Sequence, residues 1–328
     1  MISRRALVVG FDDYPKEHTL YCCVNDAKSM KELLAENGNG SANFDVQTII
    51  NRISEDDFHD HIGRLFASDD ADVALFYFSG HGYEKNGEGY IVIPTIDDGM
   101  IPIPMKNISK LANQSKIKNK VIILDCCFSG AFGGNPSLPD KVNEIGNGVT
   151  ILTACRPEES AVEIGRMKHG VFTSLLLAAL EGGAANVRGM ISPASVYSFI
   201  DQSLGPWDQR PLFKTNVSSL INLRSVEPEV NENIIRNIRK YFKTADSEFS
   251  LDPSYEFTNS EQYVIDKKEP YAIPEHVKIL KQLQKLESVG LVEPVGEEHM
   301  YFAAMNSKSC RLTILGKFYW ELLDKKRF

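Results

Sequence analysis

The sequence predicts an α/β fold in which a mostly parallel sheet is flanked by helices, followed by a smaller α+β domain. Through the first two thirds of the 328 residues, continuous apolar runs of strand length alternate with helical patterns. Such runs are typical of strands that helices cover on both faces. After Leu223 the chain becomes polar, and the stretch at 227–233 contains Pro228. This break predicts a linker, so we expect two domains, over residues 1–224 and 225–328.

Apolar spacing and cap residues place the elements of the first domain. Apolar residues recur at helical spacing from Ala27 to Leu34. Ser54 opens a capping box, and Pro193 suits the first position of a helix that follows Ser192. We expect strands at 5–10, 44–50, 72–79, 120–125 and 149–154, and helices at 25–36, 54–66, 171–181 and 193–202.

The second domain has a different pattern. One helix is expected at 234–242, an irregular stretch at 250–259 and an amphipathic helix at 277–289. A polar, hairpin-like stretch follows, and the last helix is expected at 317–324.

Charge and cysteine content exclude several classes of protein. The net charge of −8 repels nucleic acid. Residues 260–328 hold 11 Lys and Arg against 10 Asp and Glu, so the first 259 residues carry about −9. No apolar run approaches the ~18–20 residues that span a bilayer, and the start of the chain does not resemble a signal peptide. Four of the six cysteines are adjacent pairs, a poor disulfide framework. We expect a reduced, cytoplasmic protein without a membrane segment.

Two predicted strands end in residues that carry chemistry. The strand at 72–79 leads into Gly80-His81-Gly82, and the strand at 120–125 leads into Cys126-Cys127. The carboxyl ends of parallel strands meet at one edge of a sheet, where ligands bind. A cysteine and a histidine at that edge can form a dyad, with the histidine as general base and the thiolate as nucleophile. The amides at 128–130 are then candidate oxyanion donors. The alternative is that each residue is structural.

Four ordered motifs resemble the caspase-like cysteine peptidases, in particular the metacaspase and bacterial caspase-homologue branch. They cover residues 1–224 and are listed in chain order: Cys22-Cys23-Val24-Asn25-Asp26-Ala27, the His81 and Cys127 boxes 46 residues apart, Gly170-Val171-Phe172-Thr173, and Gln209-Arg210-Pro211. The box Asp125-Cys126-Cys127-Phe128-Ser129-Gly130 is similar to the metacaspase pattern Asp-x-Cys-x-Ser-Gly. That pattern makes Cys127 the nucleophile, with Cys126 as the alternative.

The resemblance also implies a substrate site. Metacaspases cut after Arg or Lys, which they bind in an acidic pocket. The resemblance assigns this pocket to Asp26 and Asp125, with Cys23 and Ser79 beside it. Paired carboxylates suit a guanidinium or ammonium group. The alternative is that Asp26 caps the helix that begins near Asn25. The backbone amides of Gly82 and Phe128 become the oxyanion donors, and Lys141 is a candidate autoprocessing site in the loop at 131–148.

Many metacaspases bind calcium through acidic residues, including a pair that lies before the Cys box. Here Ile103-Pro104 stands at that spacing, and the nearest acidic pair is Asp97-Asp98. Calcium needs many oxygen ligands, so we expect no metal site, no cofactor and no requirement for calcium.

The second domain resembles a winged helix-turn-helix module. Its helix at 277–289 offers Lys278, Lys281, Gln282 and Lys285 to DNA, but the domain is nearly neutral, whereas DNA-binding domains are basic. We expect it to bind an activator or adaptor protein. The whole chain is then an endopeptidase, in the setting of bacterial defence or cell death that the resemblance implies. The alternative is a winged-helix DNA-binding or sensor regulator with a non-proteolytic caspase-like scaffold.

Overall fold

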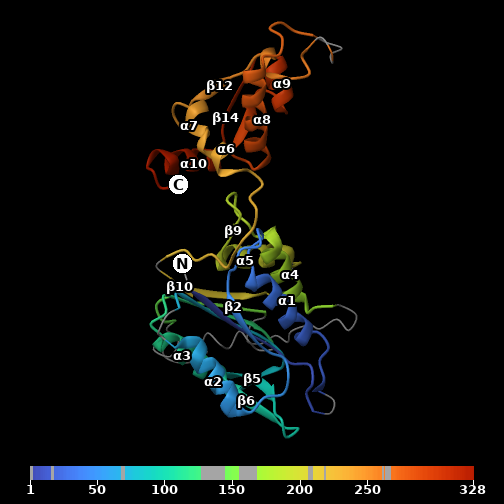
Figure 1. Cartoon of the computed structure of the whole chain (residues 1–328), viewed down its shortest axis with the longest axis vertical. Helices are drawn as coiled ribbons and strands as arrows, with labels where there is room; N and C mark the ends of the chain where they lie inside the picture. Colours follow the sequence, from blue (N-terminus) through green and yellow to red (C-terminus); the bar gives the residue numbers. More distant parts are fainter. Residues whose placement is uncertain are drawn as a thin grey trace. The chain divides into compact units, whose positions relative to one another are not determined.

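A computed structural model (Figure 1) describes residues 3–15, 18–67, 71–126, 145–154, 168–205, 210–217, 219–260, 262 and 267–328. The predicted residues Cys127, Phe128 and Lys141 lie outside these ranges. The chain forms two compact units, Met1–Glu227 and Pro228–Phe328. No helix among the described residues is long and apolar enough to cross a membrane.

A six-stranded, mostly parallel sheet forms the centre of the first unit, as predicted. Its order is β10-β8-β7-β3-β1-β2, and only the pairing of β10 with β8 is antiparallel. The strands are β1 (Arg4–Gly10), β2 (Asp45–Ile49), β3 (Val73–Ser79), β7 (Asn119–Asp125), β8 (Val149–Thr153) and β10 (Leu212–Asn216). All seven residues of β3 are buried, which explains its unbroken apolar sequence.

Helices cover both faces of this sheet (Figure 1). Along β3, Phe76 packs with α2 and α3, and Tyr77 packs with the helices of the opposite face. One face carries α2 (Glu55–Phe66) and α3 (Met105–Gln114). The other carries α1 (Cys23–Ala35), α4 (Val171–Ala178) with its π-helical extension η4 (Ala179–Gly183), and α5 (Pro193–Ser203). Two short strands, β9 (Met190–Ile191) and β11 (Arg224–Ser225), pair beside α5.

The caps of two helices follow the sequence. The Ser54 hydroxyl accepts a hydrogen bond from the Asp57 amide at the start of α2. Ser192 caps α5, with Pro193 at its first turn. Both caps satisfy backbone N–H groups that have no partner within the helix.

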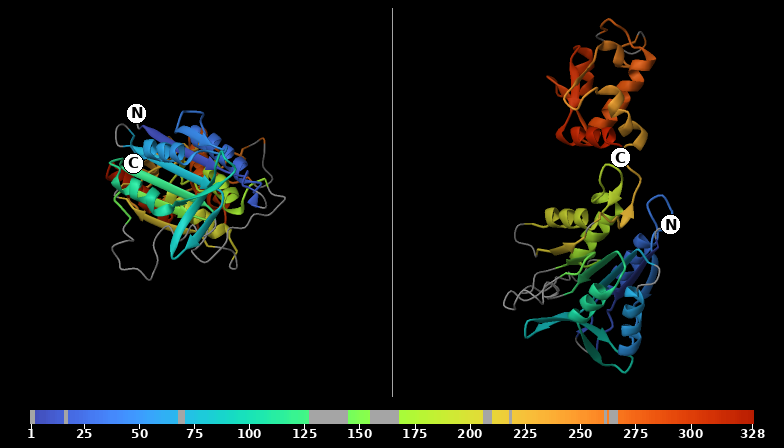
Figure 2. Two further views of the ribbon diagram at one scale, coloured as in Figure 1. Left: turned by 90° about the horizontal axis from the view of Figure 1, so that it is seen from below. Right: turned by 90° about the vertical axis from the view of Figure 1, so that its left-hand side faces the viewer.

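A second sheet, which the sequence analysis did not predict, follows His81 directly. It is antiparallel in the order β4-β5-β6, with β4 (Gly82–Lys85), β5 (Glu88–Pro94) and β6 (Met100–Pro104). Figure 2 shows these strands in teal, apart from the central sheet. Its strands contain Gly, Glu and Pro, which are uncommon in strands, so the sequence does not have a recognisable strand pattern here. The rings of Tyr83 and Tyr90 stack on it, 5.1 Å apart.

The second unit is a small α+β domain. Its strands pair in the order β12-β14-β13, and all pairings are antiparallel. The elements are α6 (Glu232–Arg236), α7 (Ile238–Tyr241), β12 (Glu248–Ser250), the 3-10 turn η5 (Pro253–Tyr255), α8 (Pro274–Ser288), β13 (Val292–Val295), α9 (Met300–Met305), β14 (Ser309–Leu312) and α10 (Ile314–Asp324).

Three expectations for this unit were wrong. The single helix expected at 234–242 is two helices that meet at Asn237, whose side chain donates to Gln282 of α8. The polar hairpin-like connection between β13 and β14 contains the helix α9. The last helix begins at Ile314, three residues early, because the Thr313 hydroxyl caps it through the Gly316 amide.

Candidate active site

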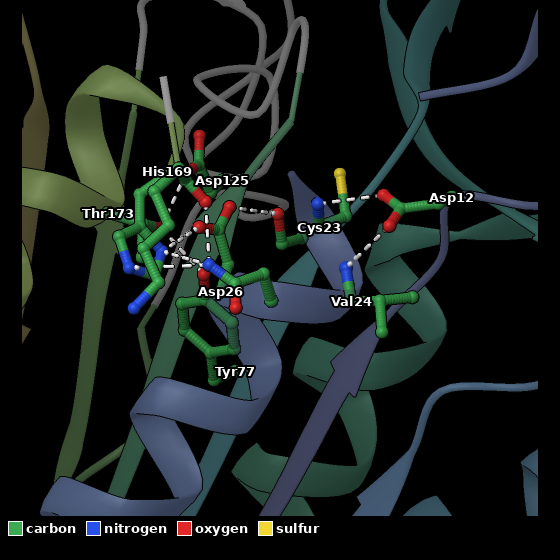
Figure 3. A network of polar contacts seen from close by, with 11 residues as sticks. Asp12, Cys23, Val24, Asp26, Tyr77, Asp125, His169 and Thr173 are labelled. Carbon is green, nitrogen blue, oxygen red and sulfur yellow. Dashed lines mark hydrogen bonds and ion pairs between the residues drawn. The ribbon is translucent and has the colours of Figure 1, made fainter. Parts of the chain in front are cut away.

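The carboxyl ends of three neighbouring strands lie side by side. Gly10 of β1 pairs with Ser79 of β3, and Ser79 pairs with Asp125 of β7. The first turn of α1 packs against this edge, because a methyl group on Gly10 would collide with the backbone carbonyl of Cys23. The edge therefore brings the first motif, at the start of α1, next to Asp125, which opens the Cys box (Figure 3).

His81 lies two residues beyond the end of β3 and is half-buried. Its Nε2 atom is 2.6 Å from the carbonyl oxygen of His18. A carbonyl only accepts hydrogen bonds, so Nε2 carries the proton and Nδ1 is left as the basic nitrogen of the neutral ring. Tyr14 holds the segment, because its hydroxyl accepts from the His81 amide at 3.0 Å and donates to the carbonyl of Val92 at 3.0 Å. The Tyr14 ring packs against the imidazole, with centroids 4.5 Å apart.

Of the two adjacent cysteines in the Cys box, the structure describes Cys126. Cys127 lies outside the described residues. Cys126 is 1% exposed and belongs to a core cluster that includes Phe78 and Leu124. A thiol packed in this way acts as a small apolar side chain, which weighs against the alternative that Cys126 is the nucleophile.

Asp26 lies in the first turn of α1, and its side chain points away from that helix's own amides. The carboxylate of Asp12 caps α1 instead, accepting from the amides of Cys23 at 2.8 Å and Val24 at 3.3 Å. The cap interpretation of Asp26 is therefore wrong. Sequence reasoning missed Asp12, although its place two residues after Gly10 puts it at the same sheet edge.

The Asp26 carboxylate is 1% exposed and has partners from two other elements. The Ser79 hydroxyl donates to Oδ2 at 3.1 Å. Nδ1 of His169 lies 2.8 Å from Oδ1, and the Gly170 amide also donates to the carboxylate. His169 was not predicted, although it directly precedes the motif that begins at Gly170.

Asp125, at the end of β7, has its own chain of partners. The Thr173 hydroxyl donates to Oδ2 of Asp125 at 2.6 Å. The same Thr173 oxygen is 2.6 Å from the hydroxyl of buried Tyr77. Because Thr173 has one hydroxyl proton, Tyr77 donates to it in turn. Thr173 belongs to the fourth motif, so this motif is joined to the Cys box.

Burial sets the electrostatics of this cluster. Burial and the neighbouring charge of Asp125 raise the pKa of Asp26 to about 8, against the lowering effect of the Ser79 and Gly170 hydrogen bonds. Burial also raises the pKa of the Cys23 thiol far above its usual value, so it stays protonated. Burial, helped by the charge of Lys168, lowers the pKa of His169.

The predicted site residues that the structure describes lie in two places: a cluster around Asp26, and the segment of His81 and Gly82. Asp26, Ser79, Asp125 and Cys23 form one cluster, in which Cys23 contacts Ser79 and interacts with both carboxylates. Gly82 opens β4 beside His81 and pairs with Ile91. Nothing in the described part of the chain places Cys127, Phe128 or Lys141 relative to this cluster.

The acidic pair considered for calcium is engaged elsewhere. Arg52 forms ion pairs with Asp98 and Asp13, and Asp97 accepts a hydrogen bond from Thr95. Among the residues that the structure describes, no group of three or more His, Cys, Asp or Glu side chains is arranged to hold a metal ion.

Comparisons with known proteins agree with this architecture. The family model of the caspase domain, Peptidase_C14, matches residues 3–218. A crystal structure of a protein from Geobacter sulfurreducens has a TM-score of 0.50 at 17% identity, covering 69% of this chain and 100% of its own, which shows a shared fold. Caspase-1 from Spodoptera frugiperda has a TM-score of 0.49 at 13% identity, covering 69% and 91%. No curated protein sequence matches the chain. The chain belongs to the caspase domain family, which indicates a cysteine peptidase.

Proposed function

We propose that the protein is a cysteine endopeptidase of the metacaspase type that cuts after Arg or Lys. One observation carries the choice of substrate: Asp26 and Asp125 approach each other at the same sheet edge as His81. Two carboxylates beside a peptidase centre attract a cation and repel the aspartate that animal caspases recognise. Ser79 and Cys23 complete the floor of this pocket, where Ser79 orients Asp26.

The mechanism begins with His81. Its Nδ1 atom takes the proton of the Cys127 thiol, because Nε2 is occupied by the His18 carbonyl. The thiolate attacks the carbonyl carbon of the scissile bond, and the amides of Phe128 and Gly82 stabilise the resulting oxyanion. The imidazolium then gives its proton to the leaving amine, and an acyl-enzyme remains. Water, activated by the neutral His81, attacks the thioester, which releases the acid product and restores the thiol.

The second unit is proposed as a module that binds an activator or adaptor protein. Of the side chains on α8 that the DNA interpretation needs, Gln282 accepts hydrogen bonds from Asn237 and Tyr241, and Lys281 packs over Phe257. These residues are engaged within the unit. On α10, Ile314 is 90% exposed and Phe318 is 56% exposed, and apolar groups suit a protein surface better than phosphates.

The assay uses fluorogenic peptides that end in Arg, Lys or Asp, with the full chain and its Cys127→Ala variant. We expect Arg and Lys peptides to be cut by the wild type alone. No turnover together with salt-dependent DNA binding would favour the regulator. Intact mass of the two proteins tests autoprocessing after Lys141, which requires Cys127. A proteome-wide cleavage profile tests the proposed place in bacterial defence or cell death.

A further inference from the structure

The pocket carboxylate Asp26 is covered in this structure by a side chain that the proposed reaction does not use. His169 precedes Gly170, the N-cap of α4, and its imidazole side chain is 15% exposed. Its Nδ1 atom contacts Oδ1 of Asp26, while Ser79 holds Oδ2. Figure 3 shows His169 beside Asp26, on the side of Asp125 and Thr173. Because Asp26 is 1% exposed, its carboxylate has no face open to a cation from solution.

The imidazole is held in place from α1. The side-chain amide of Asn25 donates to the carbonyl of Lys168 at 2.6 Å, and its nitrogen lies 3.3 Å and 3.4 Å from the two ring nitrogens of His169. These contacts fix the backbone on one side of His169 and the ring itself. The covering of Asp26 is therefore a built contact between α1 and the start of α4.

A substrate guanidinium needs the same carboxylate. A bidentate pair with Asp26 uses both oxygens, and one of them, Oδ1, is in contact with His169. Because Asp26 is 1% exposed with His169 in this position, a guanidinium can reach Oδ1 only if the imidazole moves aside, and a protonated imidazole would repel the incoming cation. Binding of a basic side chain at Asp26 thus requires His169 to leave.

We propose that His169 is a specificity-determining gate of the basic pocket: it occupies Asp26 in the empty enzyme and is displaced by the Arg or Lys side chain of the substrate. This inference rests on the proposed function. The exchange breaks the contact between His169 and Asp26 and forms an ion pair between Asp26 and the substrate, with no covalent change. Displacing His169 costs the same free energy for every basic ligand. A ligand that pairs with both Asp26 and Asp125 recovers more of this cost than one that pairs with Asp26 alone, so the gate favours it. The charged and titratable groups that face this contact are Asp12, Cys23, Tyr77, Asp125 and Lys168.

The test measures binding without turnover. Benzamidine, an aromatic amidinium, is titrated by calorimetry into the full-length Cys127→Ala protein with His169 intact, with His169→Ala and with His169→Asn. One hydrogen bond is worth up to about tenfold in affinity, so His169→Ala is expected to bind benzamidine about fivefold to tenfold more tightly. His169→Asn keeps an N–H donor near the position of Nδ1 and is expected to bind as the parent does. His59→Ala, on the opposite face of the sheet, is the matched control, with unchanged affinity.

A second readout uses the active enzyme, in which His169→Ala should lower the KM for Arg peptides by the same factor. Equal or weaker benzamidine binding by His169→Ala, in a parent that does bind, overturns the gate alone. If no variant binds benzamidine and the wild type does not cut after Arg or Lys, the proposed function fails and the gate fails with it. A His169→Asn variant that behaves like His169→Ala would also contradict the gate, since the donor would then have no role.

Discussion

The carboxylates of Asp26 and Asp125 converge on the α-carbon of Gly170. A methyl group on Gly170 would lie 3.2 Å from Oδ2 of Asp125 and 3.6 Å from Oδ2 of Asp26. The two acids come from α1 and β7, and Gly170 is the N-cap of α4. The fourth sequence motif therefore has a physical role: its glycine leaves room for two acidic side chains to lie close together.

Replacing Gly170 with Ala should weaken cleavage after Arg while leaving the fold intact. Gly170 has an extended backbone that any residue can adopt, so the effect comes from the methyl group, which must push Asp125 aside. We expect kcat/KM for Arg peptides to fall by about fivefold to twentyfold, since small displacements in a binding site have costs of this order or larger. Gly63→Ala is the control, because a methyl group there meets nothing within 4 Å. It should stabilise α2 by about 0.5–1 kcal/mol. Equal activity of both variants would contradict the account.

Replacing Asp26 with Asn should reduce activity and raise stability at neutral and alkaline pH. The pKa of Asp26 is raised to about 8 in the fold, so the folded protein holds this proton more tightly than the unfolded chain. Its contribution to stability is present below about pH 4 and is lost as pH rises toward 8, by at most about 1.4 kcal/mol per pH unit. The amide side chain in Asp26→Asn does not titrate, so the variant does not lose stability in this way as pH rises. Its melting temperature relative to the wild type should therefore increase with pH between about pH 4 and pH 8, and a constant difference would count against a buried, neutral Asp26.

The affinity of the protein for a cation should rise with pH, whereas the stability that Asp26 contributes falls. Below about pH 8 the empty pocket holds Asp26 protonated, and an amidinium must release that proton to form an ion pair. The affinity of Cys127→Ala for benzamidine should rise with pH by up to about tenfold per unit and level off above about pH 8. The lowered pKa of His169 leaves its ring neutral over the upper part of this range. The same titration with Asp26→Asn should be flat, and a rise of equal size there would assign the proton to another group.

Chelators should leave activity unchanged. Asp98 and Asp13 are paired with Arg52, and Asp97 with Thr95, so these acids are engaged without an ion. The assay compares Arg-peptide cleavage in EDTA with cleavage in added calcium. Strict dependence on calcium would refute the prediction and would direct attention to acids outside these pairs.

Local patterns of sequence predicted the central sheet, and long-range contacts decided the rest. The apolar strands β3 and β7 and the capped helices α2 and α5 are visible in the sequence because each depends on neighbouring residues. The sheet β4-β5-β6 was missed because its strands carry Gly, Glu and Pro where strand propensity is low.

The cluster of Asp26, Ser79 and Asp125 shows the same division between local and long-range signals. Asp26, Ser79 and Asp125 were predicted through the resemblance, and the fold brings them together. His169 lies 143 residues from Asp26 in sequence, and no periodicity links the two. The cap of α1 by Asp12 likewise depends on how β1 leads into the helix, and not on a local capping box.

The central claim is tested most directly by cleavage of two peptides that are identical except for Arg or Asp before the scissile bond. The wild type and the Cys127→Ala variant are assayed side by side. The account predicts that the wild type cuts the Arg peptide at least about a hundredfold faster than the Asp peptide, as expected for a buried pair of carboxylates, and that Cys127→Ala cuts neither. Preference for Asp, or activity that survives Cys127→Ala, would contradict it.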